Sequence, residues 1–475
     1  MTSRRPLPIL DASRTGAESG PVRGVSPAFT PAPGKRTAVL AFVVLSAWLL
    51  TGCGGVRVAK QVAADAAAGN YGAALQLMEK EKQQYSGPNN LLYYMDKGSL
   101  LQRVGQYGDS TQELEEAERL VEELYGTSVS EAAASMLVND MSLSYTGEDF
   151  EQVMINALKA LNFLYINDLE GAGVEARKVN TLLLKLADKY GNDAVYQQDA
   201  FARYLAAFAY EAGRDYNNAY IDYKKAYEGF QWYEKHFGMP MPALIKSDLL
   251  RLSHRLRFDD EYQRWRGVFG PDVPEPGSRP RKQGEILLVV YDGLIPAKET
   301  RYVATEITDP DGHPYALKVA FPIFRPRPNI VERVRVGLED GSTVDSELME
   351  PLDAIAYQNL EQRIGLISAK AIARATAKYI ASFQARKAAR AGSEGAGMLV
   401  GLAANVFTWA TEQADTRSWR TLPNRFHVLR LPLPAGEHQL EVRLKTIYGD
   451  VRALPPLTVK LKKGEKKVIP LYVPR

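Results

Sequence analysis

Cysteine is almost absent from this chain of 475 residues, which has a single one, Cys53, and five histidines. Structural zinc sites combine several cysteine and histidine ligands, and one cysteine cannot form a disulfide within its own chain. No two histidines lie at metal-ligand spacing on one helix; they are His236, His254, His313, His427 and His438. The sequence therefore predicts no metal site, no thiol nucleophile and no internal disulfide, so stability has to come from ordinary packing.

Sequence motifs that carry chemistry are also missing. The chain has no G-x-S-x-G, no phosphate-binding P-loop and no strand-turn-helix glycine fingerprint. The glycine-rich stretch 392–401 lacks the Lys-Ser/Thr pair of a P-loop, and the pairs Glu115/Glu116 and Glu122/Glu123 are typical of a solvated helix surface. We therefore expect no enzyme activity and no cofactor. An enzyme that draws two carboxylates from distant segments is the case that the sequence leaves open.

The distribution of charge argues against nucleic-acid binding. Residues 1–36 contain six basic and two acidic side chains and so carry +4, whereas the whole chain carries +3. The remainder is therefore close to neutral, at −1. It lacks the basic field on which binding to a phosphate backbone depends.

A charge-free apolar run, Thr37–Leu50, follows Lys35-Arg36 and ends at Thr51-Gly52-Cys53. Its fourteen residues are too few to span a bilayer as a helix, and a basic flank before such a run is typical of a secretory signal. Leu50-Thr51-Gly52-Cys53 resembles the bacterial lipobox. The resemblance implies that the signal peptidase recognises Leu50, Thr51 and Gly52 and that Cys53 receives a diacylglycerol. A single-pass signal anchor with an incidental cysteine is the alternative.

The residue after Cys53 is Gly54 rather than Asp. Lipoprotein sorting, as the resemblance implies it, then places the protein in the outer membrane, lipid-anchored and facing the periplasm. Residues 1–52 are expected to be the leader, and six prolines without periodic apolar residues make its first part unlike a folded segment. Either the start within residues 1–34 is assigned too far upstream, with Val22 or Val25 as the initiator, or the leader is unusually long.

From Ala59 to about Gly270, apolar residues recur at spacings of three and four, which predicts helices throughout. One segment resembles a tetratricopeptide (TPR) unit, in which a glycine lets two antiparallel helices approach and an aromatic residue wedges between them. The residues that carry the resemblance are Tyr94, Gly98, Leu101, Gly105, Tyr107, Ser110, Leu114 and Ala117. The match is imperfect, because Lys97 stands where leucine is usual and Ser110 where alanine is usual.

Weaker echoes of this unit flank it at Gly69-Asn-Tyr71, Gly147-Glu-Asp-Phe150 and Gly213-Arg-Asp-Tyr216. They favour an array of helical hairpins stacked into a short solenoid over residues 53–270. A non-repeating helical bundle is the alternative. Tyrosines at 216, 220, 223 and 227 share one helix face, and we interpret them as a packing seam rather than a ligand surface.

The proline-rich stretch 271–284 is a linker by composition, and the pattern changes after it. Strands are expected at 285–291, 315–324, 330–338, 342–347, 426–433, 439–446, 457–461 and 467–473. The segment 433–442 is similar to small β-sandwich modules of surface proteins. Residues 285–475 are thus expected to form a mixed β-sheet or β-sandwich domain, and the whole chain to be α+β and multidomain.

A long helical insertion, about 351–415, interrupts these strands. Its second helix, Met398–Ala410, is apolar and too short to cross a membrane, so we expect it to be buried. On the first helix, basic residues are expected to lie opposite an apolar face that includes Ile372; they are Arg363, Lys370, Arg374 and Lys378. Seven basic and no acidic residues from Gln362 to Ser393 predict contact with an anionic lipid, wall polymer or partner, or neutralisation by acidic residues elsewhere in the fold.

The chain resembles a family of uncharacterised bacterial outer-membrane lipoproteins that join a tetratricopeptide-like helical half to a mixed C-terminal half. The resemblance rests on the lipobox and on four segments, Gly147–Phe150, Asn167–Arg177, Tyr291–Lys298 and Trp419–Pro423. It implies a non-enzymatic scaffold or adaptor of the cell envelope that binds protein partners through its helical surface. A regulator of peptidoglycan synthesis or wall-polymer binding protein is the alternative, followed by a glycan-acting enzyme.

Overall fold

The computed structural model describes residues 54–85, 87–135, 141, 143–190, 199–273, 283–308, 310, 312 and 314–473. All of them belong to one compact unit, Gly54–Arg475. The lipobox residues Leu50, Thr51, Gly52 and Cys53 lie outside the described residues, as do the leader and residues 274–282 of the expected linker.

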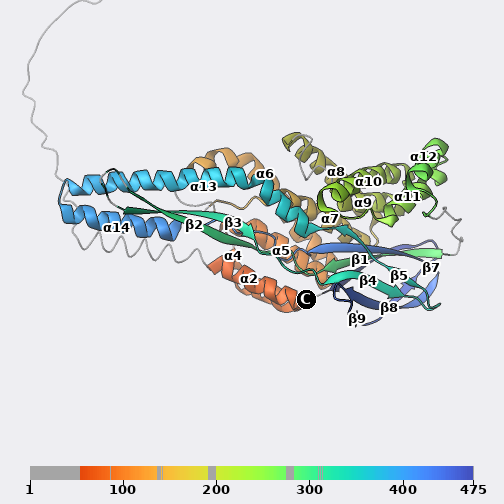
Figure 1. Cartoon of the computed structure of the whole chain (residues 1–475). Coiled ribbons are helices and arrows are strands. Elements are labelled where there is room, and N and C mark those ends of the chain that lie inside the picture. Colours follow the sequence, from red (N-terminus) through yellow and green to blue (C-terminus); the bar gives the residue numbers. More distant parts are fainter. Residues whose placement is uncertain are drawn as a thin grey trace, which may run out of the picture. The chain divides into compact units, whose positions relative to one another are not determined.

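The first part of the unit is helical, as the periodicity predicts (Figure 1). Its helices are α2 (Gly54–Ala67), α3 (Tyr71–Lys80), α4 (Lys82–Tyr85), η2 (Gly87–Asn89), α5 (Asn90–Arg103), α6 (Tyr107–Ser135), α7 (Asp149–Tyr165), α8 (Leu169–Tyr190), α9 (Ala200–Ala212), α10 (Tyr216–Phe237), α11 (Ala243–Arg255) and α12 (Asp259–Phe269).

The same turn joins the helices of five successive pairs, α2–α3, α5–α6, α7–α8, α9–α10 and α11–α12. Each turn has one residue in the left-handed region, with φ between 56° and 81°: Gly69, Gly105, Asn167, Arg214 and Arg257. The next residue donates its backbone N–H to the carbonyl five positions back, at 2.8–3.0 Å. This is the Schellman closure of a helix end, so one local geometry repeats along the helical part.

The two glycine segments that look alike in the sequence occupy different places in this pattern. Gly213–Asp215 forms the turn within the α9–α10 pair, whereas Gly147 has a φ of 78° and precedes α7, the first helix of its pair. Each segment nevertheless directly precedes or opens a helix, α7 at Asp149 and α10 at Tyr216.

The remaining elements are mostly strands, and the unit is therefore α+β. They are β1 (Gln283–Asp292), β2 (Lys298–Thr308), β3 (Pro314–Phe324), β4 (Val331–Gly337), β5 (Thr343–Asp345), β6 (Glu347–Glu350), α13 (Leu352–Arg390), α14 (Glu394–Thr411), β7 (Arg425–Pro434), β8 (Gly436–Thr446), β9 (Val451–Ala453), β10 (Leu457–Leu461) and β11 (Lys466–Val473). Strands β2 and β9 were not expected. The side chains of β2 are nearly all exposed or half-buried, so neither of its faces shows an apolar alternation.

Strand β1 is at the centre of the fold. It pairs in parallel with β11 and antiparallel with β7 in a four-stranded sheet of order β11-β1-β7-β6. Its residues Leu287, Val289 and Tyr291 belong to the core shared with the helices. The alternate residues Ile286, Leu288 and Val290 belong to a second core, shared with β4, β8 and β10. These three strands belong to a five-stranded sheet of order β10-β8-β4-β5, in which β9 pairs with β8. Both faces of β1 are therefore covered, which explains its continuous apolar sequence.

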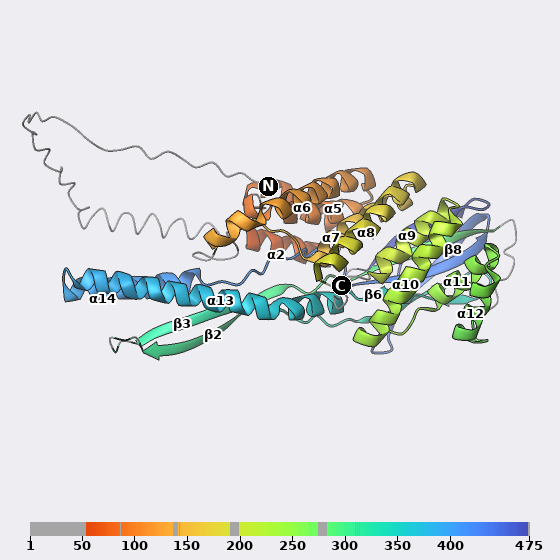
Figure 2. The ribbon, with the colours of Figure 1, turned by 90° about the horizontal axis from the view of Figure 1, so that it is seen from above.

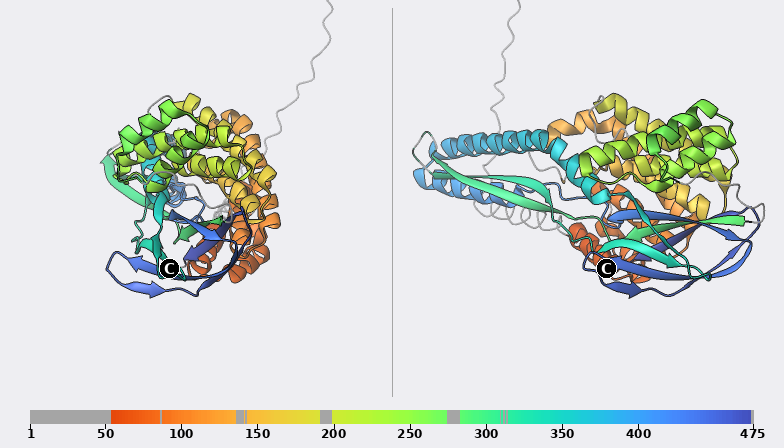
Figure 3. Two further views of the ribbon diagram at one scale, coloured as in Figure 1. Left: turned by 90° about the vertical axis from the view of Figure 1, so that its right-hand side faces the viewer. Right: turned by 45° about the vertical axis from the view of Figure 1, so that its right-hand side comes forward.

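The helices follow an arc, and the strands lie on its inner side (left view of Figure 3). Helix α7 contacts β11, α9 contacts β6, and almost every residue of α7 is buried. Phe201 of α9 stacks on Phe426 of β7 with ring centroids 4.7 Å apart. The parts that the sequence analysis assigns to two domains therefore share one hydrophobic core.

A buried ion cluster lies in this junction. It consists of three carboxylates and three cations: Glu211, Asp248 and Glu285 with Arg251, Arg430 and Lys466. Arg430 on β7 contacts Glu285 at 2.7 Å, and Lys466 on β11 contacts Glu211 at 2.7 Å. Burial by itself would raise the pKa of Glu211, but the charges of Arg251, Arg430 and Lys466 outweigh it and hold the pKa well below its usual value. The cluster is neutral overall and joins helices α9 and α11 to strands β1, β7 and β11.

Helices α13 and α14 and the β2–β3 hairpin form an arm that extends from the rest of the unit (Figures 1 and 2). Helix α13 packs on α14 and β3, and α14 also contacts β3. The expected burial of the apolar helix is wrong for one side of α14, where Met398, Leu399 and Leu402 are 71%, 73% and 61% exposed. Its neighbours in the arm, α13 and β3, cover the opposite side, and the described residues of α14 contribute nothing to the two main cores.

Two buried carboxylates interact at the start of α9. Asp199 accepts a hydrogen bond from the backbone N–H of Ala202 at 2.6 Å, and Glu350 of β6 accepts one from the hydroxyl of Tyr233 at 2.9 Å. Burial raises the pKa of Asp199 to about 6. Burial, followed by the negative charge of Asp199, raises the pKa of Glu350 well above its ordinary value. Both groups therefore favour the folded state when they are protonated.

This pair predicts a loss of stability as the pH rises. The pKa of each carboxyl group is higher in the native state than in the unfolded state, so the native state binds more protons. The unfolding free energy therefore falls as the pH rises from about 4. Glu350→Gln keeps the shape and removes one ionisation. Between pH 5 and 8, the unfolding free energy of this variant should fall less steeply with rising pH than that of the parent. The two slopes should differ by up to about 1.4 kcal/mol per pH unit.

The measurement is denaturant unfolding of residues 54–475 across this pH range, with the exposed Glu437→Gln as the control. Equal slopes for Glu350→Gln and the parent would show that Glu350 is already ionised in the fold.

Candidate functional sites

The residues of the tetratricopeptide-like segment pack the α5–α6 pair. A Cβ on Gly98 would lie 2.6 Å from Cγ of Leu114, and the hydroxyl of Ser110 donates to the carbonyl of Gly98 at 2.7 Å. Tyr94 and Leu101 lie with Gly98 on α5, Gly105 forms the turn, and Tyr107 and Ala117 lie on α6. These residues hold two helices together at close approach, so none of them forms a ligand site by itself.

A groove of about 1000 Å³ lies between α6, α7 and α8. We call it the α6–α8 groove. Apolar side chains line it at five positions, Val121, Ile155, Val174, Leu182 and Leu186. Charged groups of both signs accompany them, namely Glu118, Glu122, Asp149, Arg177, Lys178, Lys185 and Asp188. This mixture of apolar and charged side chains suits a peptide or helix with alternating apolar and polar groups.

A buried charge network supports one side of the groove. Lys159 of α7 is fully buried and contacts Glu118 at 2.8 Å and Glu175 at 3.2 Å. Lys178 contacts the same Glu118 at 2.8 Å. Burial would raise the pKa of Glu118, but hydrogen bonds from Lys159 and Lys178 outweigh it and lower the pKa. The network fixes the three helices relative to one another, which makes the groove a preformed surface.

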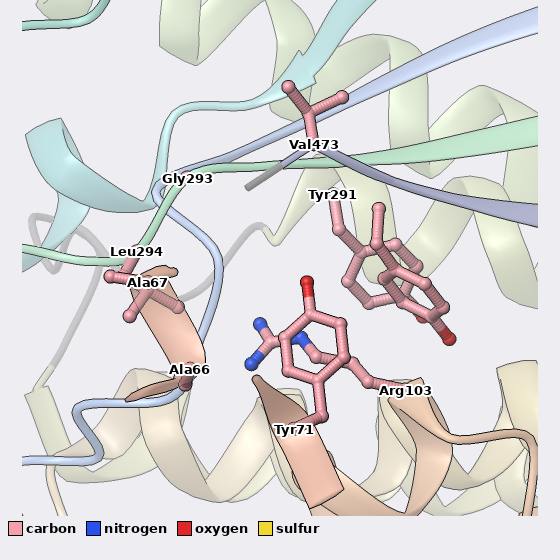
Figure 4. Close-up of a pocket in the computed structure, with 9 residues that line it drawn as sticks. Ala66, Ala67, Tyr71, Arg103, Tyr291, Gly293, Leu294 and Val473 are labelled. Atoms are coloured by element: carbon pink, nitrogen blue, oxygen red, sulfur yellow. The ribbon is translucent and has the colours of Figure 1, made fainter. Parts of the chain in front are cut away.

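A second, smaller pocket lies where α2 and α5 meet the ends of β1 and β11 (Figure 4). Its volume is about 10 Å³, which is room for one water-sized group. Arg103, the last residue of α5, lines it and is only 8% exposed. No sequence pattern signals this pocket, because its residues come from four separate segments of the chain.

The four basic residues expected on one face of the α13 helix lie in different surroundings. Arg363 forms an ion pair with Glu148, Lys370 is exposed, and Arg374 is buried. Lys378 is buried and contacts Glu412 at 3.0 Å. The expected opposition of a basic and an apolar face is therefore wrong here. Arg374 and Lys378 of the expected basic face are buried, and Ile372 of the expected apolar face is 51% exposed.

The reason for this arrangement is a carboxylate inside the arm. Glu412 follows α14 directly and is fully buried, so an unpaired negative charge there would be costly. Lys378 neutralises it and also donates to the hydroxyl of Thr411 at 3.1 Å. The basic residues that α13 leaves exposed include Lys370 and Lys387.

The tyrosines of α10 lie in a packing seam. Tyr220 and Tyr223 are buried, and Tyr216 and Tyr227 pack partly buried against the same core. Tyr223 donates its hydroxyl to Glu211 at 2.9 Å, and Trp265 of α12 donates to the hydroxyl of Tyr220 at 2.9 Å. The hydroxyls of Tyr220 and Tyr223 are thus engaged within the fold.

No protein-family model matches this chain, and no curated protein matches it. Among the residues that the structure describes, none of the helices is both long enough and apolar enough to cross a membrane. Within the same residues, no cluster of three or more His, Cys, Asp or Glu side chains is arranged to hold a metal ion.

Proposed function

We propose that this chain is a lipid-anchored adaptor of the bacterial cell envelope, which binds a protein partner in the α6–α8 groove and catalyses no reaction. The lipobox Leu50-Thr51-Gly52-Cys53 supports attachment to the periplasmic face of the outer membrane. The groove is the observation that carries the binding function, because it is large, preformed and lined by both apolar and charged groups.

The arrangement of the helices supports this choice of surface. In a helical solenoid, the concave side is the usual binding surface. Here the chain's own strands lie on the inner side of the arc, where Phe201 stacks on Phe426. A partner would therefore bind elsewhere on the helical part, and the groove offers apolar side chains that remain accessible, such as Val174 at 38% exposure.

The repeated turn supports the proposal that the helical part is a degenerate tetratricopeptide-like array. Five pairs close with the same left-handed residue and the same backbone hydrogen bond. Gly98, Leu114 and Ser110 give the α5–α6 pair the close approach that such units use. The 62-residue and 47-residue intervals between the turns at Gly105, Asn167 and Arg214 are longer than the 34 residues of a regular tetratricopeptide repeat, which fits degenerate units.

The second candidate function is binding of wall polymer or anionic lipid, which includes regulation of peptidoglycan synthesis. The exposed Lys370 and Lys387 on α13 favour it, because α13 has no acidic residue after Glu361. The glycan-acting enzyme has less support, since two hydroxyls of the tyrosine-rich helix α10, those of Tyr220 and Tyr223, bond within the fold.

The lipid anchor is tested by Cys53→Ala. This variant removes the chain's one thiol, so palmitate labelling should fall to background and the leader should stay uncleaved by the lipoprotein peptidase. Palmitate labelling and gel mobility of Cys53→Ala are compared with those of the parent and of Cys53→Ser, which also lacks the thiol. Palmitate incorporation that persists in Cys53→Ala would contradict the anchor.

Groove binding is tested with a photocrosslinking residue at Thr181, which lines the groove, in the full-length protein in its native envelope. We expect a discrete crosslinked protein, and Val174→Arg should lower its yield about tenfold, which corresponds to about 1.4 kcal/mol of binding free energy. The matched control is Ile221→Arg on α10, an aliphatic residue with 48% exposure outside the groove. Equal yields in the two arginine variants would contradict binding in the groove.

Binding through the arm is tested with Lys370→Glu/Lys387→Glu. Co-sedimentation of residues 54–475 with wall sacculi and with phosphatidylglycerol vesicles should fall severalfold in low salt, and the difference should vanish in high salt. Lys80→Glu/Lys235→Glu makes the same charge change at exposed lysines of α3 and α10 and serves as the control. An equal loss in both double variants would show that net charge, and not the arm, determines binding.

A further inference from the structure

Arg103 is a buried cation with no carboxylate at ion-pair distance among the described residues. The residue is 8% exposed, and its Nη1 atom is buried without a hydrogen-bond partner among the described residues. Burial lowers the pKa of its guanidinium, which nevertheless stays charged at neutral pH. A guanidinium that has lost its water needs a counter-charge or acceptor atoms in return.

The pocket around Arg103 offers donors and aromatic rings but no anion. None of its nine lining residues carries a negative charge, and three of them are tyrosines, Tyr71, Tyr291 and Tyr472. Tyr291 and Tyr472 donate their hydroxyls to the side-chain and backbone oxygens of Gln102, at 2.8 and 3.1 Å. These two phenols accordingly direct their protons away from the pocket.

Tyr71 completes the site. Its ring centroid lies 5.5 Å from the guanidinium carbon of Arg103, and the two side chains lie next to each other in the pocket (Figure 4). The cation–π contact and the carboxyl end of the α5 dipole compensate a guanidinium only in part, because each is weaker than a desolvated ion pair. Among the lining residues that the structure describes, none supplies an acceptor that carries a negative charge.

Two other buried arginines, Arg417 and Arg430, show what full compensation looks like. Arg417 contacts Asp415 at 2.7 Å, and Arg430 contacts Glu285 at 2.7 Å. In both cases the chain supplies the carboxylate. At Arg103, the described residues leave a cavity of about 10 Å³ instead.

We propose that this pocket binds a small monatomic anion, a halide, held by the guanidinium of Arg103 and the hydroxyl of Tyr71. The size of the cavity selects a water-sized group and excludes sulfate and phosphate. The lining residues come from α2, α3, α5, β1 and β11 and the turn after β1, so the anion links the first helices to the ends of the central parallel strands. Binding therefore stabilises this junction. The inference does not depend on the proposed adaptor function.

The first test is thermal unfolding of residues 54–475 at constant ionic strength, with gluconate, which is too large for the pocket, replaced stepwise by chloride or bromide. For the parent we expect a saturable rise of the midpoint by a few degrees, since a ligand that binds the native state stabilises it. Arg103→Met should abolish the rise, and Tyr71→Phe should shift its half-saturation to a higher concentration. The control is Arg255→Met, which removes an exposed arginine that lies 3.9 Å from the ring of Tyr216 outside any such pocket.

A rise of equal size in Arg103→Met would overturn the proposal, and so would a rise in the parent that does not saturate. The second test remains informative if Arg103→Met fails to fold. Crystals of the parent grown in bromide should show an anomalous peak within hydrogen-bond distance of the Arg103 guanidinium. Bromide peaks elsewhere on the surface, with none in the pocket, would also overturn it.

Discussion

The buried ion cluster around Arg430 is the interaction on which the arrangement of this protein depends. Its members come from helices and strands that are up to 255 residues apart in the chain, as in the contact between Glu211 and Lys466. Removing one partner of a buried pair costs about 3–5 kcal/mol, because the remaining charge stays desolvated and unpaired. The cluster therefore favours a single register between α9, α11 and the sheet, since a shifted register would leave charges unmatched.

The position of the helices on the sheet decides which surfaces remain for function. The inner side of the arc is taken up by contacts such as that between Phe201 and Phe426, so the binding surface expected of a solenoid is used for folding. A second set of polar contacts extends this junction, in which Thr421 donates to Asp96 at 2.7 Å and the backbone N–H of Trp419 donates to Glu151 at 2.7 Å. The α6–α8 groove and the arm lie outside these contacts, and they are where the proposed functions lie.

The sequence predicted the local elements well and their mutual packing poorly. Periodicity located the helices and most strands, and β1 was recognisable because both of its faces are buried. Strand β2 escaped because its side chains are exposed and show no alternation. The expected division near residues 271–284 did not anticipate the shared core, because pairs such as Arg430 and Glu211 leave no trace in local sequence. The groove and the Arg103 pocket escaped for the same reason, since each gathers residues from separate helices or strands.

Arg103 and Arg430 are two buried guanidinium groups whose positive charges are compensated in different ways. Arg430 contacts three carboxylates of its own chain, so its site is closed and no external anion is needed. Arg103 lies at the edge of the same sheet, beside Tyr71 and a cavity, and its Nη1 atom has no partner among the described residues. The closed cluster fixes the position of the helices permanently. The open pocket makes the stability of a neighbouring contact depend on the anion that surrounds the protein.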